Sequence, residues 1–371
     1  MGTRPEAIKM APLIKEFQKN PSFETHVCIT AQHREMLDQV LEFFSIVPDY
    51  DLDLMTPNQS LNLLASRLFA GIDGVLETVK PDVVFVHGDT LTSTIAAWAS
   101  FLRSVKVAHI EAGLRTYNKF SPFPEEMNRQ ITGRLADYHF APTEGAREHL
   151  LREGVNEASV CVTGNTVIDA LNLGVSIIDS GYEGTDLKMV KKIAATDKKL
   201  ILVTGHRREN FGQGFENLCL ALKTLASEPD VEIIYPVHLN PNVQEPVNRI
   251  LGTCSNIHLI APVDYPAFIY LMKQSYFIIT DSGGVQEEAP SLGKPVLLTR
   301  DTTERPEALE AGTVIMVGTN AEAIIRESRT LLSSPEAYRK MSVAHNPYGD
   351  GQACHRILDY FMKQSSSPER N

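Results

Sequence analysis

Cysteine, tryptophan and long hydrophobic runs are all scarce in this chain of 371 residues. The five cysteines are odd in number, widely scattered and without metal-site spacing, so we expect reduced thiols and no disulfide framework. No run approaches the roughly 18 apolar residues that a membrane helix needs, and the N-terminus shows no apolar signal segment. These absences argue against a disulfide-stabilised secreted domain and a membrane-spanning protein. They predict a soluble, cytoplasmic protein.

Positive charge is also in deficit, because 35 Lys and Arg stand against 46 Asp and Glu, which gives a net charge of −11. A surface for nucleic acid or anionic membrane needs the opposite balance, so neither partner is expected. A small anionic ligand in a local cationic pocket fits the composition better. The histidines lack the paired spacing of a transition-metal site, and no dinucleotide-binding glycine pattern follows a strand. We therefore expect no metal and no nicotinamide cofactor.

Short apolar runs alternate with amphipathic stretches along the whole chain. Runs continuous in Val, Ile and Leu are typical of parallel strands buried on both faces, and the stretches between them, such as Ala7 to Gln18 and Phe215 to Ala226, are typical of helices. The expected strands are His26 to Thr30, Val83 to His87, Val105 to Ile110, Tyr138 to Ala141, Leu200 to Thr204, Val231 to Val237, Ile257 to Ile260, Tyr276 to Thr280 and Val296 to Thr299. This alternation predicts an α/β fold of doubly wound, Rossmann-like sheets.

A chain of this length exceeds what one hydrophobic core usually holds, so two domains are expected. The segment Ser180 to Asp197 is polar and lacks a buried-strand pattern, and we place the linker there. The predicted domains cover residues 1–168 and 169–348, and residues 349–371 form a C-terminal helix with a polar tail. Because ligands of doubly wound sheets bind outside the carboxyl ends of the strands, we expect the ligand in a cleft between the domains.

The stretch Asp281 to Glu288 follows an apolar run and opens a predicted helix. Its two glycines, Gly283 and Gly284, let backbone N–H groups approach an anion closely, and a helix N-terminus favours negative charge. Glu288, one turn into the helix, is placed to accept hydrogen bonds from ribose hydroxyls. The stretch therefore predicts a phosphate-binding turn. The alternative is a glycine turn that merely satisfies chain geometry.

Cationic side chains occur at three further predicted turns. One glycine turn leads into the first helix, a second turn follows the strand that ends at Thr204, and a third follows the strand that ends at Thr299. The cationic candidates at these turns are Arg4, Lys9, His206, Arg207 and Arg305. Such groups suit a diphosphate. A solvated loop and a surface salt bridge are the alternatives for the second and third turns.

Acidic residues follow two of the predicted strands. Asp89 comes two residues after one strand end and Glu111 directly after the next, so both are candidate acid/base groups at the carboxyl edge of a sheet. The alternative for Asp89 is a helix N-cap. A third cluster, from Glu125 to Arg129, follows a loop rich in Ser, Pro and Phe that is suited to close over a substrate, with a Pro-led helix start as the alternative. His238 ends another strand and is left unassigned.

Five stretches of this sequence resemble motifs of the bacterial non-hydrolysing UDP-N-acetylglucosamine 2-epimerases. They are Gly2-Thr3-Arg4-Pro5-Glu6-Ala7-Ile8-Lys9, His87-Gly88-Asp89-Thr90, Glu111-Ala112-Gly113-Leu114-Arg115, His206-Arg207-Arg208-Glu209 and Asp281-Ser282-Gly283-Gly284-Val285-Gln286-Glu287-Glu288. The resemblance spans nearly the whole chain. It implies a GT-B fold that holds the UDP-sugar between two Rossmann-like domains, and a homodimeric isomerase that interconverts UDP-GlcNAc and UDP-ManNAc without a cofactor.

The resemblance also implies roles for individual residues. The residues implied to hold uridine and the diphosphate are Phe268, Ser282, Gly283, Gly284 and Glu288, with Arg4, Lys9, His206 and Arg305 as further ligand contacts. The implied catalytic group is Asp89, Glu111, Glu125 and His206, with Arg129 close to the acids. In some members a second UDP-GlcNAc binds beside the active site and activates the enzyme, and the matching residues are Gln32, Arg207 and His238.

Members of that family begin with a short apolar strand ahead of the glycine turn, whereas this chain starts at Met1, directly before Gly2. We therefore expect the first sheet to lack a central strand. Its unmade ladder hydrogen bonds and the groove left behind are expected to cost several kcal/mol.

The chemistry of the substrate favours one mechanism. The C2 proton of an N-acetylhexosamine is not beside a carbonyl group, so its direct removal has no enolate to stabilise. Elimination of UDP across C1 and C2 needs only a base, stabilisation of the leaving group and a closed site. We therefore hypothesise anti elimination to 2-acetamidoglucal and re-addition of UDP, with the roles of the three carboxylates left open. The alternatives are a hydrolysing epimerase that releases ManNAc and UDP, a glycosyltransferase, and a non-catalytic UDP-sugar sensor.

Overall fold

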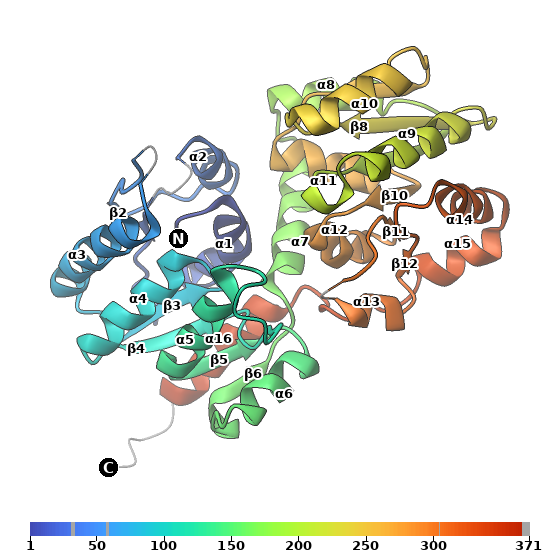
Figure 1. Ribbon diagram of the computed structural model, residues 1–371. Helices are drawn as coiled ribbons and strands as arrows, with labels where there is room; N and C mark the ends of the chain where they lie inside the picture. Colours follow the sequence, from blue (N-terminus) through green and yellow to red (C-terminus); the bar gives the residue numbers. More distant parts are fainter. Residues whose placement is uncertain (31–33, 57–58, 304, 366–371) are drawn as a thin grey trace. The chain divides into compact units, whose positions relative to one another are not determined.

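The computed structural model of the protein describes residues 1–30, 34–56, 59–303 and 305–365 (Figure 1). These residues form two compact units. Unit 1 comprises Met1–Leu173 and the C-terminal segment from Tyr348, and unit 2 comprises Gly174–Pro347. Every strand pair in both units is parallel, which confirms the predicted α/β class. No helix in the described part of the chain has the length and apolarity to cross a membrane.

Unit 1 contains a four-stranded sheet, in the order β3-β4-β5-β6, and a separate pair, β1-β2. Its strands are β1 (Cys28–Ile29), β2 (Tyr50–Asp51), β3 (Val83–His87), β4 (Lys106–Ile110), β5 (Tyr138–Ala141) and β6 (Val160–Val162). Its helices are α1 (Arg4–Lys19), α2 (Arg34–Phe43), α3 (Leu61–Val79), α4 (Leu91–Leu102), α5 (Glu125–Leu135), α6 (Glu144–Arg152), η1 (Glu157–Ser159) and α16 (Ala353–Ser365). The helix α7 (Thr166–Asp179) contains the division between the units.

The first residue of the chain lies beside β1. The amino group of Met1 donates to the carbonyl oxygen of Cys28 at 2.9 Å, and the amide of Thr30 donates to the carbonyl of Met1, also at 2.9 Å. Gly2 follows at a crowded position, because a Cβ there would lie 2.6 Å from the hydroxyl oxygens of Thr30 and Thr92. The turn before α1 is therefore bonded to the end of β1 and packs closely against the first turn of α4.

Unit 2 contains one six-stranded sheet in the order β12-β11-β10-β7-β8-β9. Its strands are β7 (Lys199–Thr204), β8 (Val231–Pro236), β9 (Ile257–Ile260), β10 (Phe277–Thr280), β11 (Val296–Leu298) and β12 (Val314–Met316). Its helices are α8 (Thr185–Ile193), η2 (Arg208–Asn210), α9 (Gln213–Leu225), α10 (Pro241–Leu251), α11 (Tyr265–Gln274), α12 (Gly283–Glu288), η3 (Ala289–Leu292), α13 (Pro306–Glu310), α14 (Ala321–Ser333) and α15 (Pro335–Ser342). The strand order reverses between β7 and β10, which is where a doubly wound sheet binds its ligands.

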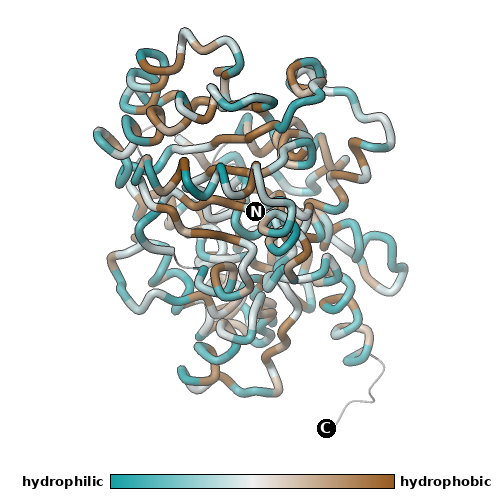
Figure 2. The backbone as a smooth tube through the Cα atoms, turned by 90° about the vertical axis from the view of Figure 1, so that its right-hand side faces the viewer, coloured by the Kyte–Doolittle hydropathy of each residue, from teal (hydrophilic) through white to brown (hydrophobic). Residues whose placement is uncertain are grey.

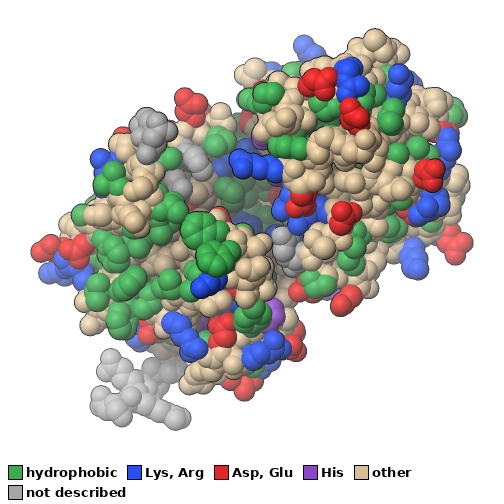
Figure 3. All heavy atoms as spheres, in the orientation of Figure 1, with side chains coloured by type: hydrophobic (Ala, Val, Ile, Leu, Met, Phe, Trp, Pro, Cys, Tyr) green, Lys and Arg blue, Asp and Glu red, His purple; other side chains and the backbone are tan. Residues whose placement is uncertain are grey.

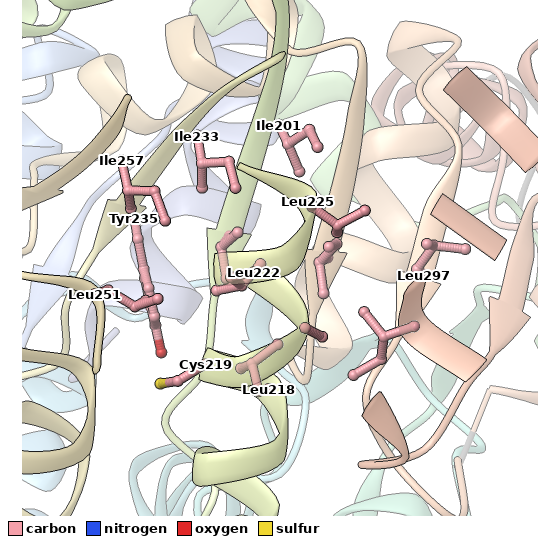
Figure 4. Packing of buried hydrophobic residues seen from close by; sticks show 14 of the residues in the cluster. Ile201, Leu218, Cys219, Leu222, Leu225, Ile233, Tyr235, Leu251, Ile257 and Leu297 are labelled. Carbon is pink, nitrogen blue, oxygen red and sulfur yellow. The ribbon is translucent and has the colours of Figure 1, made fainter. Parts of the chain in front are cut away.

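The core of unit 2 lies between the sheet and its helices. Ile201 and Ile233 project from neighbouring strands onto Leu222 of α9, and all three side chains are fully buried (Figure 4). Figure 2 shows the same pattern along the chain, with hydrophobic residues concentrated on strands and hydrophilic residues on many of the loops. This packing gives the strand ends, where the candidate site residues lie, a rigid base.

The predicted linker at Ser180 to Asp197 is wrong, because this segment contains α8 and belongs to unit 2. Leu187 and Val190 of α8 are fully buried, and the helix packs against α11. Two buried apolar residues three positions apart give a short helical stripe, which lacks the continuous apolar run that indicates a buried strand.

Candidate functional site

Two acidic residues lie at the same edge of the unit 1 sheet. The strands β3 and β4 pair in parallel through His87 and Ile110, so the residues that follow them emerge together. Glu111 forms an ion pair with Lys9 of α1 and accepts a hydrogen bond from Asn165 Nδ2 at 2.9 Å. The strand-end rule therefore places Glu111 correctly, and the fold adds a cation from a helix that begins more than 100 residues earlier in the chain.

Glu111 is held as an anion in an unusual backbone conformation. Burial raises the pKa of its carboxyl group, but the positive charge of Lys9, the nearby His87 and the hydrogen bonds outweigh burial and hold the pKa well below 4.5. Its φ angle is +62°, in the left-handed region that a non-glycine residue rarely adopts. Such a conformation costs of order 1 kcal/mol and persists only where the surroundings enforce it, as functional sites often do.

Asp89 forms an ion pair with Arg129 of α5, and its carbonyl oxygen accepts from Asn128 Nδ2 at 2.9 Å. The helix N-cap that was the alternative for Asp89 is instead Thr90, whose hydroxyl accepts from the amide of Ser93. The carboxylate of Asp89 is therefore not used in capping. The structure brings Asp89 together with Arg129, as the resemblance implies.

Glu125 is the first residue of α5 and is partly exposed, which agrees with a helix start in this cluster. Its neighbour Glu126 is fully buried and accepts from the amides of Thr116 at 2.8 Å and Tyr117 at 3.1 Å. Burial raises the pKa of Glu126, but the hydrogen bonds, led by that from the Thr116 amide, outweigh burial and lower it. Glu126 thus anchors to α5 the loop of residues 116–124, a role that the sequence did not reveal.

Glu6 is a second buried carboxylate that the sequence analysis missed. Its Oε2 accepts from the amides of Gly2 at 2.9 Å and Thr3 at 2.8 Å, while its Oε1 accepts from the hydroxyls of Thr90 at 2.8 Å and Ser93 at 3.0 Å. One side chain therefore ties the turn that carries Arg4 to the turn that carries Asp89. In the sequence, Thr3 followed three residues later by a Glu is the pattern of a capping box. That pattern could have predicted the contact of Glu6 with Thr3, but not its contacts with Thr90 and Ser93.

In unit 2, α12 begins at Gly283, as the motif predicts. A Cβ at Gly283 would lie only 2.6 Å from Nη1 of Arg305, so a side chain at this position would displace that guanidinium group. Arg305 also donates to Glu287 at 2.6 Å, and the Glu287 side chain is almost fully buried. Arg305 thus forms the salt bridge that was its alternative, but with a buried partner, and the structure places its guanidinium group beside the glycine turn.

Glu288 and Phe268 lie near the same turn. Glu288 is buried, and its Oε1 accepts from the hydroxyl of Tyr265 at 3.0 Å. Phe268 lies on the same helix as Tyr265, α11, and is partly exposed. Ser282 is the N-cap residue of α12, and its amide donates to Thr280 at 2.9 Å. The hydrogen bond from Tyr265 thus holds the side chain of Glu288 beside the glycine turn.

His206 follows β7 and lies beside Asp281, which follows β10. The ring of His206 also stacks on that of His238, with centroids 6.0 Å apart. Arg207, the next residue, is partly exposed. Gln32, the remaining residue of the proposed regulatory site, lies outside the described residues.

The candidate residues thus form two groups, each described within its own unit. The unit 1 group contains Lys9, Asp89, Glu111, Glu125 and Arg129, with Arg4 exposed at the start of α1. The unit 2 group contains His206, Phe268, Ser282, Gly283, Gly284, Glu288 and Arg305. Among residues that the structure describes, no group of three or more His, Cys, Asp or Glu side chains is arranged to hold a metal ion.

Comparison with known proteins first defines the class of fold. A solved glycosyltransferase from Rickettsia africae superposes with a TM-score of 0.62 over 98% of this chain and 95% of its own, at 15% identity. This likeness concerns the fold alone. The fold is of the GT-B type, as predicted.

The chain belongs to the UDP-N-acetylglucosamine 2-epimerase family, whose sequence profile matches residues 15–362. It is 58% identical to the UDP-N-acetylglucosamine 2-epimerase of Yersinia pestis over 96% of both chains, and 54% identical to that of Campylobacter jejuni over 98% of this chain and 96% of the relative. A crystal structure of the Neisseria meningitidis UDP-GlcNAc 2-epimerase bound to UDP-GlcNAc is 50% identical, covers 98% of each chain and has a TM-score of 0.86. The family resemblance inferred from the motifs is thereby confirmed.

Proposed function

We propose that this protein is an isomerase that interconverts UDP-GlcNAc and UDP-ManNAc at C2. The observation that carries the proposal is the pair of acidic residues, Asp89 and Glu111, each in an ion pair at the same edge of a parallel sheet in a chain of this family. The Neisseria relative binds UDP-GlcNAc, which supports the same substrate here.

Nucleotide binding is proposed for the glycine turn of unit 2. Arg305 supplies a cation beside Gly283, and its guanidinium group is suited to the oxygens of a diphosphate. Ser282 and Gly284 are proposed to contact the same diphosphate, and Glu288 the ribose. The remaining proposed ligand contacts are Phe268 and His206 in unit 2 and Arg4, Lys9 and Arg129 in unit 1.

The reaction is proposed to run through elimination. A base takes the C2 proton, the C2–H electron pair forms the C1=C2 double bond, and the C1–O bond breaks to release UDP beside 2-acetamidoglucal. UDP then adds back at C1, and C2 receives a proton on the opposite face. The charge of Lys9 and the hydrogen bonds hold Glu111 as an anion, so it begins the reaction without a proton. We propose that Asp89, Glu111 and Glu125 between them remove and return the C2 proton, and that His206 is a further catalytic contact of the nucleotide sugar.

Proton NMR in D2O tests the function directly. The purified protein with UDP-GlcNAc is expected to produce nucleotide-linked ManNAc that carries deuterium at C2, because the glycal intermediate takes its new proton from exchangeable groups. Free ManNAc with UDP would favour the hydrolysing reaction. No change in a folded sample that binds UDP would favour the sensor, and turnover that depends on an added acceptor would favour a glycosyltransferase.

The cellular setting follows from the reaction. We propose a cytoplasmic enzyme that supplies UDP-ManNAc for cell-surface polysaccharides, and the five free cysteines suit a reducing compartment. Regulation by a second UDP-GlcNAc at Gln32, Arg207 and His238 stays a prediction.

A homodimer is proposed on the outer face of α3 and α4. Figure 3 shows apolar side chains gathered over these helices, and the exposed fraction of Trp98 is 43%, of Phe101 57% and of Leu102 66%. A contiguous apolar face of this kind is typical of a protein–protein contact. A second copy of the chain is the partner that the family resemblance implies.

Charge on this face is expected to break the dimer. Wild-type protein should sediment at twice the chain mass of 41.1 kDa, and a Trp98→Glu, Phe101→Glu variant as a monomer, because two buried carboxylates would face apolar surface. Val343→Glu is the matched control, since Val343 is also apolar and 74% exposed but lies in unit 2. A dimer that survives the double substitution would contradict the assignment of this face.

A further inference from the structure

The carboxyl ends of β7 and β10 bring an acid and a histidine together at the point where the strand order of unit 2 reverses. The two strands pair directly through Thr204 and Thr280, whose hydroxyl oxygens are 2.6 Å apart. Asp281 follows Thr280 and is fully buried, whereas the side chain of His206, two residues beyond Thr204, is 48% exposed. The carboxylate thus lies behind the ring, which faces solvent.

The two oxygens of Asp281 have different surroundings. Oδ2 accepts from the backbone amides of His206 and Arg207, both at 2.9 Å, and Asn210 Nδ2 lies 3.4 Å away. Oδ1 is buried, and no well-aligned hydrogen bond reaches it from the described residues. The ring nitrogen Nδ1 of His206 lies 3.1 Å from this oxygen. The first oxygen therefore shapes the backbone turn, and the second is left to face the imidazole.

Asp281 is an anion despite its burial. Loss of solvent raises the pKa of its carboxyl group, but the His206 ring and the two backbone amides outweigh that effect and lower the pKa below 3.8. A buried anion accepts hydrogen bonds and donates none. It therefore requires the proton of a neutral imidazole to lie on the facing nitrogen, Nδ1. The stacked ring of His238 restricts the same imidazole from another side.

We propose that Asp281 is a positioning residue that acts through His206. It fixes the imidazole with its proton on Nδ1 and so leaves Nε2 as the ring nitrogen available to the nucleotide sugar. This inference rests on the proposed function, because it assigns His206 a place in the epimerase reaction. It adds the residue that determines which nitrogen of His206 meets the substrate.

The Asp281→Asn variant separates this role from the shaping of the turn. The oxygen of Asn can still accept from the two backbone amides, but its NH2 group then faces Nδ1 of His206 as a donor. Nδ1 must become the acceptor, and the ring proton moves to Nε2. The same substitution beside other catalytic histidines inverts the tautomer while the geometry stays intact.

Two measurements are expected to show the effect. Two-bond 1H–15N spectra at a pH of about 8.5, above the ordinary histidine pKa of about 6.5, should show His206 with Nδ1–H in the wild type and Nε2–H in Asp281→Asn. The kcat should fall by at least about 100-fold while KM changes less than about threefold. The signals of His206 are identified by their loss in His206→Gln. Asp230→Asn, an exposed residue of the same unit, is the matched control and should change neither readout.

A double-mutant cycle completes the test. If Asp281 acts through His206, Asp281→Asn should lower kcat by less than about twofold in a His206→Gln background. An equal loss in both backgrounds, or Nε2–H in the wild type, overturns the proposal. If Asp281→Asn does not fold, or His206→Gln has no measurable turnover, the wild-type spectrum tests the proposal by itself. Nδ1–H on His206 then supports it, and Nε2–H overturns it. A wild type that binds UDP without epimerising UDP-GlcNAc contradicts the proposed function instead, while the tautomer still tests the Asp281–His206 pair.

Discussion

Replacing Asp89 by Asn is expected to lower kcat for epimerisation by about 10²- to 10⁴-fold, the range that one general acid or base supplies. The amide is close to the carboxylate in shape, but it can neither take up nor deliver a proton. Its oxygen can still accept from Arg129, the present partner of Asp89, so α5 should stay in place. UDP affinity, measured by calorimetry, should change little because the proposed nucleotide contacts lie largely in unit 2.

The control for Asp89 lies at the other end of the same strand. Asp82 precedes β3, is exposed, and should tolerate replacement by Asn with no change in kcat. If Asp89→Asn epimerises UDP-GlcNAc at the wild-type rate, Asp89 has no acid/base role. If UDP affinity falls as steeply as kcat, the residue acts in binding.

Replacing Glu6 by Ala is expected to lower the free energy of unfolding by about 3 kcal/mol, because truncation leaves buried donors without their acceptor. The donors are the amides of Gly2 and Thr3 and the hydroxyls of Thr90 and Ser93. Urea denaturation measures the loss. The partly exposed Glu16 lies on the same helix, and Glu16→Ala should cost less than about 1 kcal/mol.

The charge of Glu6 also predicts a dependence on pH. Burial raises its pKa, but the Met1 amino group and the hydrogen bonds from Gly2 and Thr90 outweigh burial and hold the pKa below 4.5. A lowered carboxyl pKa contributes stability above the ordinary value, and that stability is lost as pH falls through the folded-state pKa. The stability difference between wild type and Glu6→Gln should therefore shrink as pH falls below 4.5. A difference that stays constant down to pH of about 2 would contradict an ionised Glu6.

Much of the sheet structure was predictable because buried parallel strands are apolar throughout. The strands Val83–His87, Tyr138–Ala141 and Ile257–Ile260 have the predicted bounds. The strands β2, β6 and β12, each of two or three residues, were missed. In β2 the sequence Tyr50–Asp51 has no apolar run, and its pairing with β1 depends on tertiary contacts.

Site residues were predictable only where a chemically suitable side chain directly follows a predicted strand. Asp89 and Glu111 could be placed because parallel strands bring their carboxyl ends to one edge. Glu6 could not be placed fully, because its partner Ser93 is 87 residues away. The partners of Asp281 likewise lie 74 and 75 residues earlier in the chain. Such contacts follow from the order of strands in a sheet, which no local pattern encodes.

The left-handed backbone at Glu111 sets two selective pressures against each other. Glycine adopts a φ of +62° without strain, so a library of variants selected for folding alone should accumulate glycine at this position. Selection for epimerase activity should instead retain the glutamate, because glycine removes the carboxylate that pairs with Lys9. The proposed role of Glu111 thus predicts that chemistry outweighs conformational preference at position 111, and a homologue with glycine there would be expected to keep the fold after losing the reaction.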